Sequence, residues 1–366
     1  MPNETPLGAK LPVSEGPLVL PANAIMNFLP AYTVMIVTIQ RKPVPPVAGD
    51  RIGLLTAEVA SRWRATDPLL PTPAGPQPNC GAQLQVTDVD RRLLAAGECE
   101  HWQGAAGSLD LTWGAAHQFR LTPRVAGPDA GTSLDELLSV WRDHLAAVPG
   151  IDGADTAAVV TWPSRDTGGV QPLLRHGFAP LAVIAARRTR GQPTDRGPDL
   201  RDDGIRLRRA GLADIDAVVG LGLEVIRYDA RVSGVTERRE TPAALRAECA
   251  DLLSGPEPWA WLAERDGAPV GMVIAEPPDA AAWLAPLVGA APCAYLLLMG
   301  VQAAERCRGV GAALAARLHH DIASAGVQVM LLHYAQVNPL SAPFWSQQGY
   351  RPLWTVWEAR PASTVR

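Results

Sequence analysis

The residue pattern with the clearest chemical potential is Arg306-x-x-Gly309-x-Gly311. The apolar run Ala294–Val301 just before it is typical of a buried strand. Apolar residues spaced four apart just after it are typical of one helix face: Val310, Leu314, Leu318 and Ile322. The sequence therefore predicts that a strand leads through a glycine-rich turn directly into a helix.

A turn of this kind suits a phosphate group. The first backbone N–H groups of a helix lack intrahelical partners, and the helix dipole is positive at that end. Gly309 and Gly311 carry no Cβ, so the backbone can approach a ligand closely. Arg306 and Arg308 can add charge-assisted hydrogen bonds. A lone glycine-rich turn is equally typical of a plain surface connection, so its surroundings decide between the two readings.

A second group of motifs lies downstream. Val329–Tyr334 is typical of a strand, and Asn338, the aromatic pair Phe344-Trp345 and the pair Gly349-Tyr350 follow it. Together with the turn, these motifs resemble the acetyl-CoA site of the GCN5-related N-acetyltransferases, the GNAT superfamily. The loop pattern of that family is Arg or Gln, two residues, Gly, one residue, then Gly or Ala. The resemblance covers residues 205–360.

The resemblance implies a fold and an activity. The fold is α/β (α+β), with a mixed central sheet flanked by helices, and coenzyme A inserts where two parallel strands splay apart. The activity is transfer of an acyl group, most often acetyl from acetyl-CoA, to a primary amine of a small molecule or peptide by direct attack. The resemblance assigns cofactor contacts to Met299, Gly300, Val301, Arg306, Cys307, Arg308, Gly309, Val310, Gly311, Ala312, Asn338, Phe344 and Trp345.

The residue expected to protonate the leaving thiolate departs from the family pattern. Many members carry a Tyr seven residues after the Asn, and here that position is Trp345. An indole N–H donates a hydrogen bond but does not transfer its proton, so Trp345 could only solvate a thiolate. Tyr334 and Tyr350 are nearby substitutes, and the alternative interpretation of both is a core or rim aromatic. The departure also leaves open a non-catalytic module that senses CoA or binds a protein.

His333 is a candidate general base, because an imidazole titrates near neutral pH. Strand alternation places His333 on one face of its strand and Tyr334 on the other. The sequence does not say which face meets the cleft, and we favour Tyr334 because no buried partner for His333 can be identified.

The family's acceptor site lies where the first helix of the domain ends. Glu224 and Asp229 are candidate catalytic residues there, and Arg227, Tyr228 and Asp229 are candidate substrate contacts. A solvated loop is the alternative interpretation.

The length of 366 residues suggests two domains. An internal repeat supports this, because Asp166–Arg188 aligns without a gap onto Asn338–Arg360. We predict two tandem GNAT-like domains with the following bounds: a tail at 1–25 preceding a strand at Ala31–Ile39, a degenerate domain without a CoA loop at 26–190, a linker at 191–204, and a catalytic domain at 205–366.

The first copy differs where the phosphate turn would lie. Pro128 removes an N–H donor, and the carboxylate of Asp129 would repel a phosphate. Ser133 and Glu136 have the spacing of a capping box, which predicts a helix starting at Leu134. We therefore expect the first domain to bind no CoA.

Composition narrows the class of protein. The net charge of -4, without a long basic block, argues against nucleic acid or an anionic membrane as a partner. The five cysteines include no C-x-x-C pair, so neither disulfides nor a metal site is expected. No signal peptide is evident, and we expect a cytoplasmic monomer or homodimer whose partner is an amine acceptor.

Overall fold

The computed structural model describes residues 49–75, 81–127, 129–189 and 204–366. These belong to one compact unit, Val34–Arg366. The predicted tail at 1–25, the strand predicted at Ala31–Ile39 and nearly all of the predicted linker at 191–204 lie outside the described residues.

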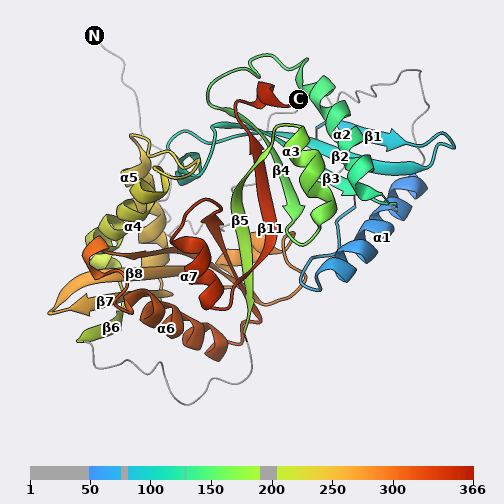
Figure 1. The fold of residues 1–366 in the computed structure, drawn as a ribbon. Helices are drawn as coiled ribbons and strands as arrows, with labels where there is room; N and C mark the ends of the chain where they lie inside the picture. The colour runs from blue at the N-terminus through green and yellow to red at the C-terminus, as the bar shows by residue number, and fades with distance from the viewer. Residues whose placement is uncertain (1–48, 76–80, 128, 190–203) are drawn as a thin grey trace, which may run out of the picture. The chain divides into compact units, whose positions relative to one another are not determined.

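The described strands form one mixed sheet in the order β1-β2-β3-β4-β11-β5-β10-β9-β8-β7-β6 (Figure 1). The first half of the chain, 49–189, supplies α1 (Gly49–Thr66), β1 (Gln83–Thr87), β2 (Leu93–Gln103), β3 (His117–Val125), α2 (Ala130–Leu145), β4 (Thr156–Pro163), α3 (Val170–Arg175) and β5 (Ala179–Arg188). The second half, 204–366, supplies β6 (Ile205–Arg209), α4 (Ile215–Asp229), α5 (Thr241–Leu253), β7 (Ala260–Arg265), β8 (Ala268–Glu276), β9 (Cys293–Val301), α6 (Val310–Ser324), β10 (Val329–Ala335), α7 (Ser341–Gln347) and β11 (Arg351–Ala359). Short 3-10 helices include η2 (Leu109–Thr112) and η5 (Ala280–Leu284).

The two halves exchange their last strands. β5 of the first half pairs antiparallel with β10 of the second half, and β11 of the second half pairs antiparallel with β4 of the first half. β5 and β11 also pair with each other at the middle of the sheet. Each half therefore contributes a strand to the sheet of the other. The domain bounds predicted from the sequence stay a prediction.

The predicted repeat has the same local structure in both copies. β4, α3 and β5 follow one another as β10, α7 and β11 do, which confirms the strand–helix–strand order predicted for each copy. The hairpin of β7 and β8 is confirmed as well. Its turn residues Asp266 and Gly267 have φ angles of 51° and 79°, and positive values at both central positions are what a type I′ turn requires.

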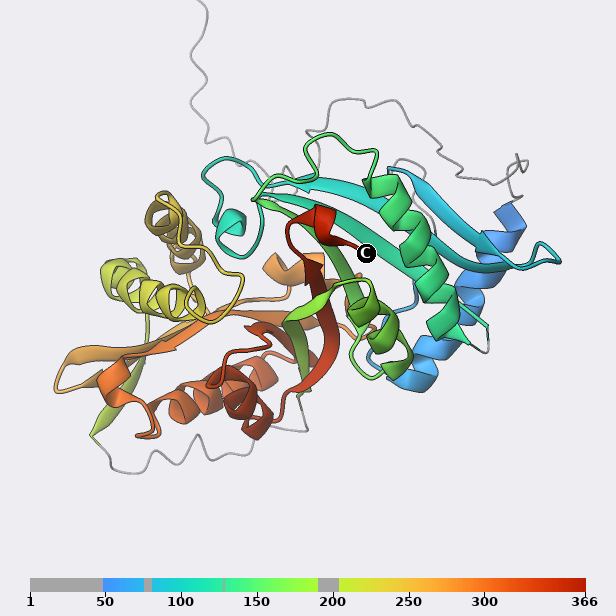
Figure 2. The same cartoon turned by 45° about the horizontal axis from the view of Figure 1, so that its top comes forward.

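Helices cover both faces of the second-half sheet, as Figure 2 shows. α4 and α5 pack on one face through a core that includes Leu221, Leu245 and Leu298. α6 and α7 pack on the other face through a core that includes Leu314, Met330 and Trp345. Two faces are thereby distinguished near the predicted site, and they are called the α4/α5 face and the α6/α7 face below.

The predicted start of the first-half helix was wrong. α2 begins at Ala130, and its N-cap is Asp129, whose carboxylate accepts a hydrogen bond from the backbone N–H of Thr132 at 3.1 Å. Ser133 lies inside the helix, where its hydroxyl donates to the Asp129 carbonyl. Asp and Ser are about equally favoured as N-cap residues. In this chain Asp129 is the N-cap, so the helix begins four residues before the predicted start.

The helices in the described part of the chain are all too short or too polar to cross a membrane.

Candidate active site

Two parallel strands separate at the predicted cofactor site. β9 and β10 are paired from Cys293 and Val329 as far as Leu296 and Leu332. Beyond that point β9 continues to Val301, while β10 continues to Ala335 along β5 instead. The sheet therefore opens between β9 and β10 just before the glycine-rich turn.

The turn itself leaves a helix N-terminus open. The predicted strand and helix are confirmed as β9 and α6, and Gly309 is the N-cap of α6. Gly309 has a φ of 84°, no side chain caps the helix, and no atom lies within 4 Å of the position where its Cβ would stand. Cys307, Arg308 and Gly309 are exposed. The uncapped N–H groups at this end therefore face open space, which is the arrangement that binds an anion.

The two arginines of the turn are oriented differently. The Nε–H of Arg306 donates to the carbonyl oxygen of Val301 at 3.1 Å, and its guanidinium lies 5.4 Å from the centre of the Tyr228 ring. Arg306 thereby joins the end of β9 to the end of α4. Arg308 is exposed and lies 3.5 Å from Glu305. Of the two side chains, Arg308 is the freer to approach a phosphate.

The first turn of α6 is packed against the protein only on the side of Val310 and Gly311. A Cβ on Gly311 would stand 3.3 Å from the Phe344 ring and 3.7 Å from the Met299 methyl group. Val310 is buried under this turn, and Ala312 is exposed. Phe344 and Met299 therefore position the helix end rather than lie free in a cleft.

The packing of α4 on β9 gives one reason for a glycine at position 300. A Cβ there would stand 2.8 Å from Val225 Cγ2 and 3.1 Å from the carbonyl oxygen of Leu221. Gly300 therefore lets α4 approach β9 closely, and its predicted cofactor contact stays a prediction.

The structure brings together two residues that the sequence assigned to different roles. Asn338, a cofactor candidate, donates from Nδ2 to Oδ1 of Asp229, an acceptor-side candidate, at 2.6 Å. The Oδ1 of Asn338 accepts from the backbone N–H groups of Leu340 and Ser341, which fixes the turn before α7. Burial raises the pKa of Asp229, and the Asn338 hydrogen bond opposes that rise.

The other acceptor candidates lie along the last two turns of α4. Glu224 and Arg227 are exposed, and Arg227 pairs with Glu237 of the following loop at 3.0 Å. Tyr228 is half-buried beneath the Arg306 guanidinium. Tyr228 and Asp229 are thus joined to the cofactor turn and to Asn338, whereas Glu224 and Arg227 face solvent.

His333 and Tyr334 lie on opposite faces, as alternation predicted. His333 is on the α4/α5 face, and its Nδ1 lies 2.9 Å from the hydroxyl of Tyr295, a partner that sequence reasoning did not find. The surrounding protein lowers the pKa of His333 to about 4, although the side chain is exposed. Tyr334 packs on the α6/α7 face, and burial raises its pKa.

Trp345 belongs to the core of the α6/α7 face. It is buried and makes edge-to-face contacts with Phe344 and Tyr350 at ring-centre distances of 4.8 and 5.3 Å. Its neighbour Tyr350 lies 3.1 Å from Nε2 of His319 through its hydroxyl. The tryptophan that replaces the family's tyrosine therefore fills space in this structure.

The corresponding site in the first half borders a cavity of about 460 Å³, but its lining differs from that of the second half because it includes Arg62 and Asp129. β3 and β4 also stop pairing, at Leu121 and Val160, before either strand ends. There Arg62 of α1 donates to the Val125 carbonyl oxygen and pairs with the carboxylate of Asp166, which aligns with Asn338 in the repeat. The carboxylate of Asp129 occupies the N-terminus of α2, where the second half leaves α6 uncapped.

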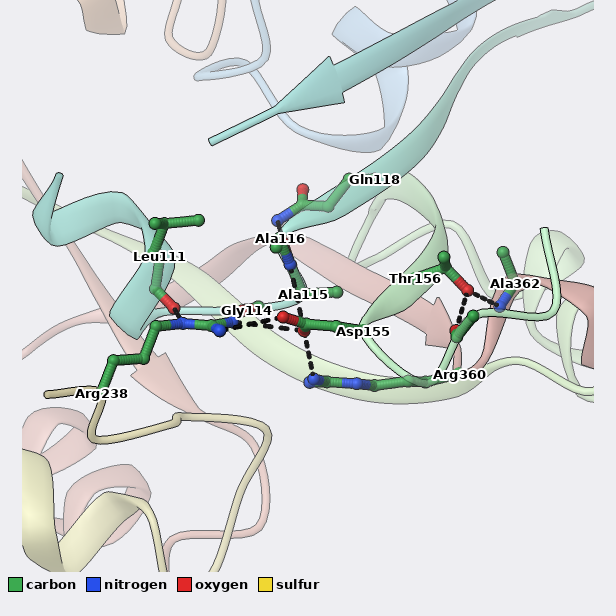
Figure 3. A network of polar contacts seen from close by, with 11 residues as sticks. Leu111, Gly114, Ala115, Ala116, Gln118, Asp155, Thr156, Arg238, Arg360 and Ala362 are labelled. Atoms are coloured by element: carbon green, nitrogen blue, oxygen red, sulfur yellow. Dashed lines mark hydrogen bonds and ion pairs between the residues drawn. The ribbon is translucent and has the colours of Figure 1, made fainter. Parts of the chain in front are cut away.

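The loop that connects α4 to α5 is held by the first half, as Figure 3 shows. Arg238 of this loop donates to the Asp155 carboxylate at 2.9 and 3.2 Å and to the Leu111 carbonyl oxygen at 2.6 Å. Arg360, after β11, donates to the same carboxylate at 2.9 Å. The hydroxyls of Thr241 and Thr112 lie 2.8 Å apart beside this network. The first half therefore fixes the loop that borders the acceptor candidates.

Sequence reasoning missed Glu276 and Tyr295. Both are buried and titratable, and they are neighbours across β8 and β9. A carboxylate at the end of an otherwise apolar strand was the available signal, since buried Glu is rare unless it has a partner or a function.

Comparison with known proteins agrees with this geometry. Residues 226–350 match the model of the acetyltransferase (GNAT) family. These residues form a GNAT acetyltransferase domain. The matched range begins in α4 and ends just before β11, so it contains the open strands, the turn and Asn338. The protein is thus an acetyltransferase. No curated protein matches the sequence.

One solved structure supports the fold over most of the chain, and two others are similar at lower TM-scores. A GCN5-related N-acetyltransferase of Sphaerobacter thermophilus is 17% identical, with a TM-score of 0.53, over 87% of this chain and 95% of that one. A tandem GNAT protein from the clavulanic acid biosynthesis pathway is 17% identical over 87% and 98%, with a TM-score of 0.39. An N-acetyltransferase of Thermoplasma acidophilum in complex with coenzyme A is 12% identical over 43% and 98%, with a TM-score of 0.33.

The GNAT family uses acetyl-CoA, and the residues of the turn fit its phosphates. The α6 N-terminus has no side-chain cap, Gly309 faces open space, and Arg308 is exposed beside it. In the described ranges, no group of three or more His, Cys, Asp or Glu side chains is placed to hold a metal ion.

Proposed function

We propose that the second half transfers an acetyl group from acetyl-CoA to a primary amine of a small molecule or peptide by direct attack. The observation that carries this proposal is the uncapped N-terminus of α6, which follows directly on the strand that separates from β10. When bound, acetyl-CoA supplies an activated acyl group as a thioester. The N–H groups at the start of α6 and the Arg308 guanidinium would hold its phosphates.

The two faces of the sheet would divide the chemistry. Tyr334 lies on the α6/α7 face, beside the cofactor turn, and its raised pKa keeps its hydroxyl protonated at neutral pH. Tyr334 is therefore suited to donate a proton to the leaving thiolate. His333 lies on the α4/α5 face, where Tyr228 and Asp229 border the approach of an amine. With these roles, the proton donor Tyr334 and the acceptor amine lie on opposite faces of the sheet at the opening between β9 and β10.

The first half would act as a support. In its own half-site the carboxylate of Asp129 caps α2 where a phosphate would bind, and Arg238 joins Asp155 to the acceptor loop. We propose that it binds no CoA and that it holds the α4–α5 loop in place.

The test is turnover with a panel of amines. Spermidine, glucosamine and a lysine-containing peptide would each be incubated with acetyl-CoA, thiol release would be followed in time, and products would be identified by mass spectrometry. Acetylated product with at least one primary amine supports the proposal. A protein that binds acetyl-CoA in calorimetry but yields no acetylated product from any of them would contradict it.

A further inference from the structure

A cluster of four side chains lies on the α4/α5 face beside the opening between β9 and β10: Glu276, Trp283, Tyr295 and His333. Glu276 of β8 is paired across the strands with Tyr295 of β9. Tyr295 is paired with Leu331 of β10, and alternation places His333 on the same face. Three adjacent strands and η5 therefore contribute to what we call the Glu276 cluster.

The members of the Glu276 cluster are in direct contact. The indole Nε1–H of Trp283 donates to Oε2 of Glu276 at 2.8 Å. The hydroxyl of Tyr295 lies 2.9 Å from Nδ1 of His333. The rings of Trp283 and Tyr295 meet edge to face with centres 5.0 Å apart. These contacts fix the orientation of a carboxylate and an imidazole on either side of one tyrosine.

The Glu276 cluster is buried at its base and open at its ends. Glu276 is 8% exposed and Tyr295 is 9% exposed, whereas Trp283 is 47% exposed and His333 is also exposed. His333 follows Leu332, the last residue of β10 that pairs with β9, so it stands where the two strands begin to separate. An amine that approaches the opening from the α4/α5 face therefore meets this cluster.

The charges around Glu276 suit a proton acceptor at neutral pH. Burial raises the pKa of Glu276 to about 7, the Trp283 hydrogen bond opposes the rise, and Glu248 of α5 adds to it. Tyr295 is paired with Glu276 across the strands, and His333 contacts Tyr295. Burial raises the pKa of Tyr295 and the surrounding protein lowers the pKa of His333, so both side chains are neutral at pH 7. A carboxylate whose pKa lies near the working pH can both take up and release a proton.

We propose that Glu276 receives the proton that the acceptor ammonium loses, with Tyr295 and His333 positioning the acceptor nitrogen at the edge of the opening. The inference rests on the proposed function, since it requires an amine on the α4/α5 face. One ammonium N–H bond breaks and the Glu276 carboxylate gains that proton. The freed lone pair forms the amide C–N bond as the thioester C–S bond breaks. The departing thiolate takes a proton from Tyr334, and the second proton that the amine loses returns to Tyr334.

The first measurement needs no acceptor. In a protein labelled with ¹⁵N at tryptophan, the Trp283 indole resonance is identified by its loss in Trp283→Phe. It should shift with a midpoint near neutral pH as Glu276 titrates, and it should stop shifting in Glu276→Gln. An indole resonance that is unchanged across neutral pH would overturn the proposal, because Glu276 would then not change its protonation.

The second measurement is the pH dependence of kcat/KM with the most rapidly acetylated amine of the panel. Glu276→Gln keeps the shape of the side chain, so acetyl-CoA affinity should be unchanged while kcat/KM at pH 7 falls about 10²- to 10⁴-fold. The limb near pH 7 should disappear. In Glu248→Gln the limb should remain and move to lower pH, because a neighbouring negative charge is gone. A limb that survives Glu276→Gln unchanged would overturn the proposal.

A matched pair of tyrosine variants tests the positioning role. Tyr295→Phe removes the hydroxyl beside His333, and Tyr350→Phe removes the equally buried hydroxyl beside His319 on the other face. Tyr295→Phe should raise KM for the amine at least tenfold, and Tyr350→Phe should leave it unchanged. Equal effects would overturn the positioning role.

The two measurements separate two kinds of failure. If the wild-type protein acetylates no amine, the proposed function fails, while the indole titration still shows whether Glu276 exchanges a proton at neutral pH. If amines are acetylated and Glu276→Gln is fully active, the proposed function stands and this inference fails.

Discussion

Asn338 donates a hydrogen bond to Asp229 across 2.6 Å, joining the turn after β10 to the last residue of α4. Asn338 also caps the turn that leads into α7. A residue on the cofactor side of the proposed site thereby fixes a carboxylate on the acceptor side. The two sides of the site are coupled by one contact.

Asp229→Asn tests this coupling through pH. Burial raises the pKa of Asp229 in the folded state above its value in the unfolded chain. The free energy of unfolding therefore falls as the pH rises from the unfolded pKa through the raised folded pKa, because a charged carboxylate is disfavoured in the fold. A neutral Asn avoids this loss. We expect the thermal midpoint of Asp229→Asn to exceed that of the wild type increasingly as the pH rises above about 4, the ordinary pKa of an Asp in an unfolded chain. Acetyl transfer should fall at the same time. A midpoint difference that is independent of pH would contradict the assignment.

Gly309→Asp should abolish acetyl-CoA binding. The substitution adds a carboxylate at the uncapped end of α6 and a side chain at a φ of 84°. Gly309→Asn is the matched control, because Asn tolerates a left-handed backbone and carries no charge. Isothermal titration calorimetry should find one binding site per wild-type chain, weaker binding in Gly309→Asn and none in Gly309→Asp. Two sites per wild-type chain would mean that the first half also binds CoA.

Gly300→Ala should destabilise the protein by about 1–3 kcal/mol, because its Cβ would press against the Leu221 carbonyl oxygen and Val225. Gly220→Ala in α4 is the control, since no atom lies within 4 Å of its Cβ position and Ala favours a helix by up to about 1 kcal/mol. Urea unfolding should move the two midpoints in opposite directions. Equal midpoints would show that α4 does not lie so close to β9.

Arg238→Ala should raise KM for the amine while changing the free energy of unfolding only slightly. Asp155 is 39% exposed at its side chain, so solvent screens the pair and its loss should cost only about 1 kcal/mol. The α4–α5 loop loses its anchor, however, and KM for the amine should rise while acetyl-CoA affinity stays constant. Arg246→Ala, which breaks an exposed pair with Asp216, is the control and should change neither. A rise in the Kd for acetyl-CoA would contradict a role confined to the acceptor side.

The exchanged strands predict that neither half folds alone. A fragment ending at residue 190 keeps β5 but lacks β10 and β11, both of its partners in the sheet. It also leaves β4 without β11, as a bare edge. We expect such a fragment to be unfolded or aggregated by circular dichroism and gel filtration. Co-expression with residues 191–366 should restore a soluble complex. A monomeric, cooperatively unfolding fragment would contradict this.

Local patterns determined much of this protein. The Asp266-Gly267 hairpin, the strand that leads into the glycine-rich turn, and α6 all follow from residue types within a few positions of one another. These features depend on backbone conformation and hydrophobic period, which neighbouring residues set. The order of elements in each half could be predicted for the same reason.

The tertiary structure decided the rest. The exchange of β5 and β11 depends on pairing between strands far apart in the sequence. The residue pattern of each strand is compatible with either position in the sheet, so the sequence does not select its partner. The partners of His333 and Asp229 are equally remote: Tyr295 belongs to another strand and Asn338 to another turn. Alternation separated His333 from Tyr334, but only the packing of Tyr334 under α6 and α7 and the contact of His333 with Tyr295 showed which side each one meets. The role of Glu276 also required the fold, because burial raises its pKa and burial is set by neighbours that the sequence does not place beside it.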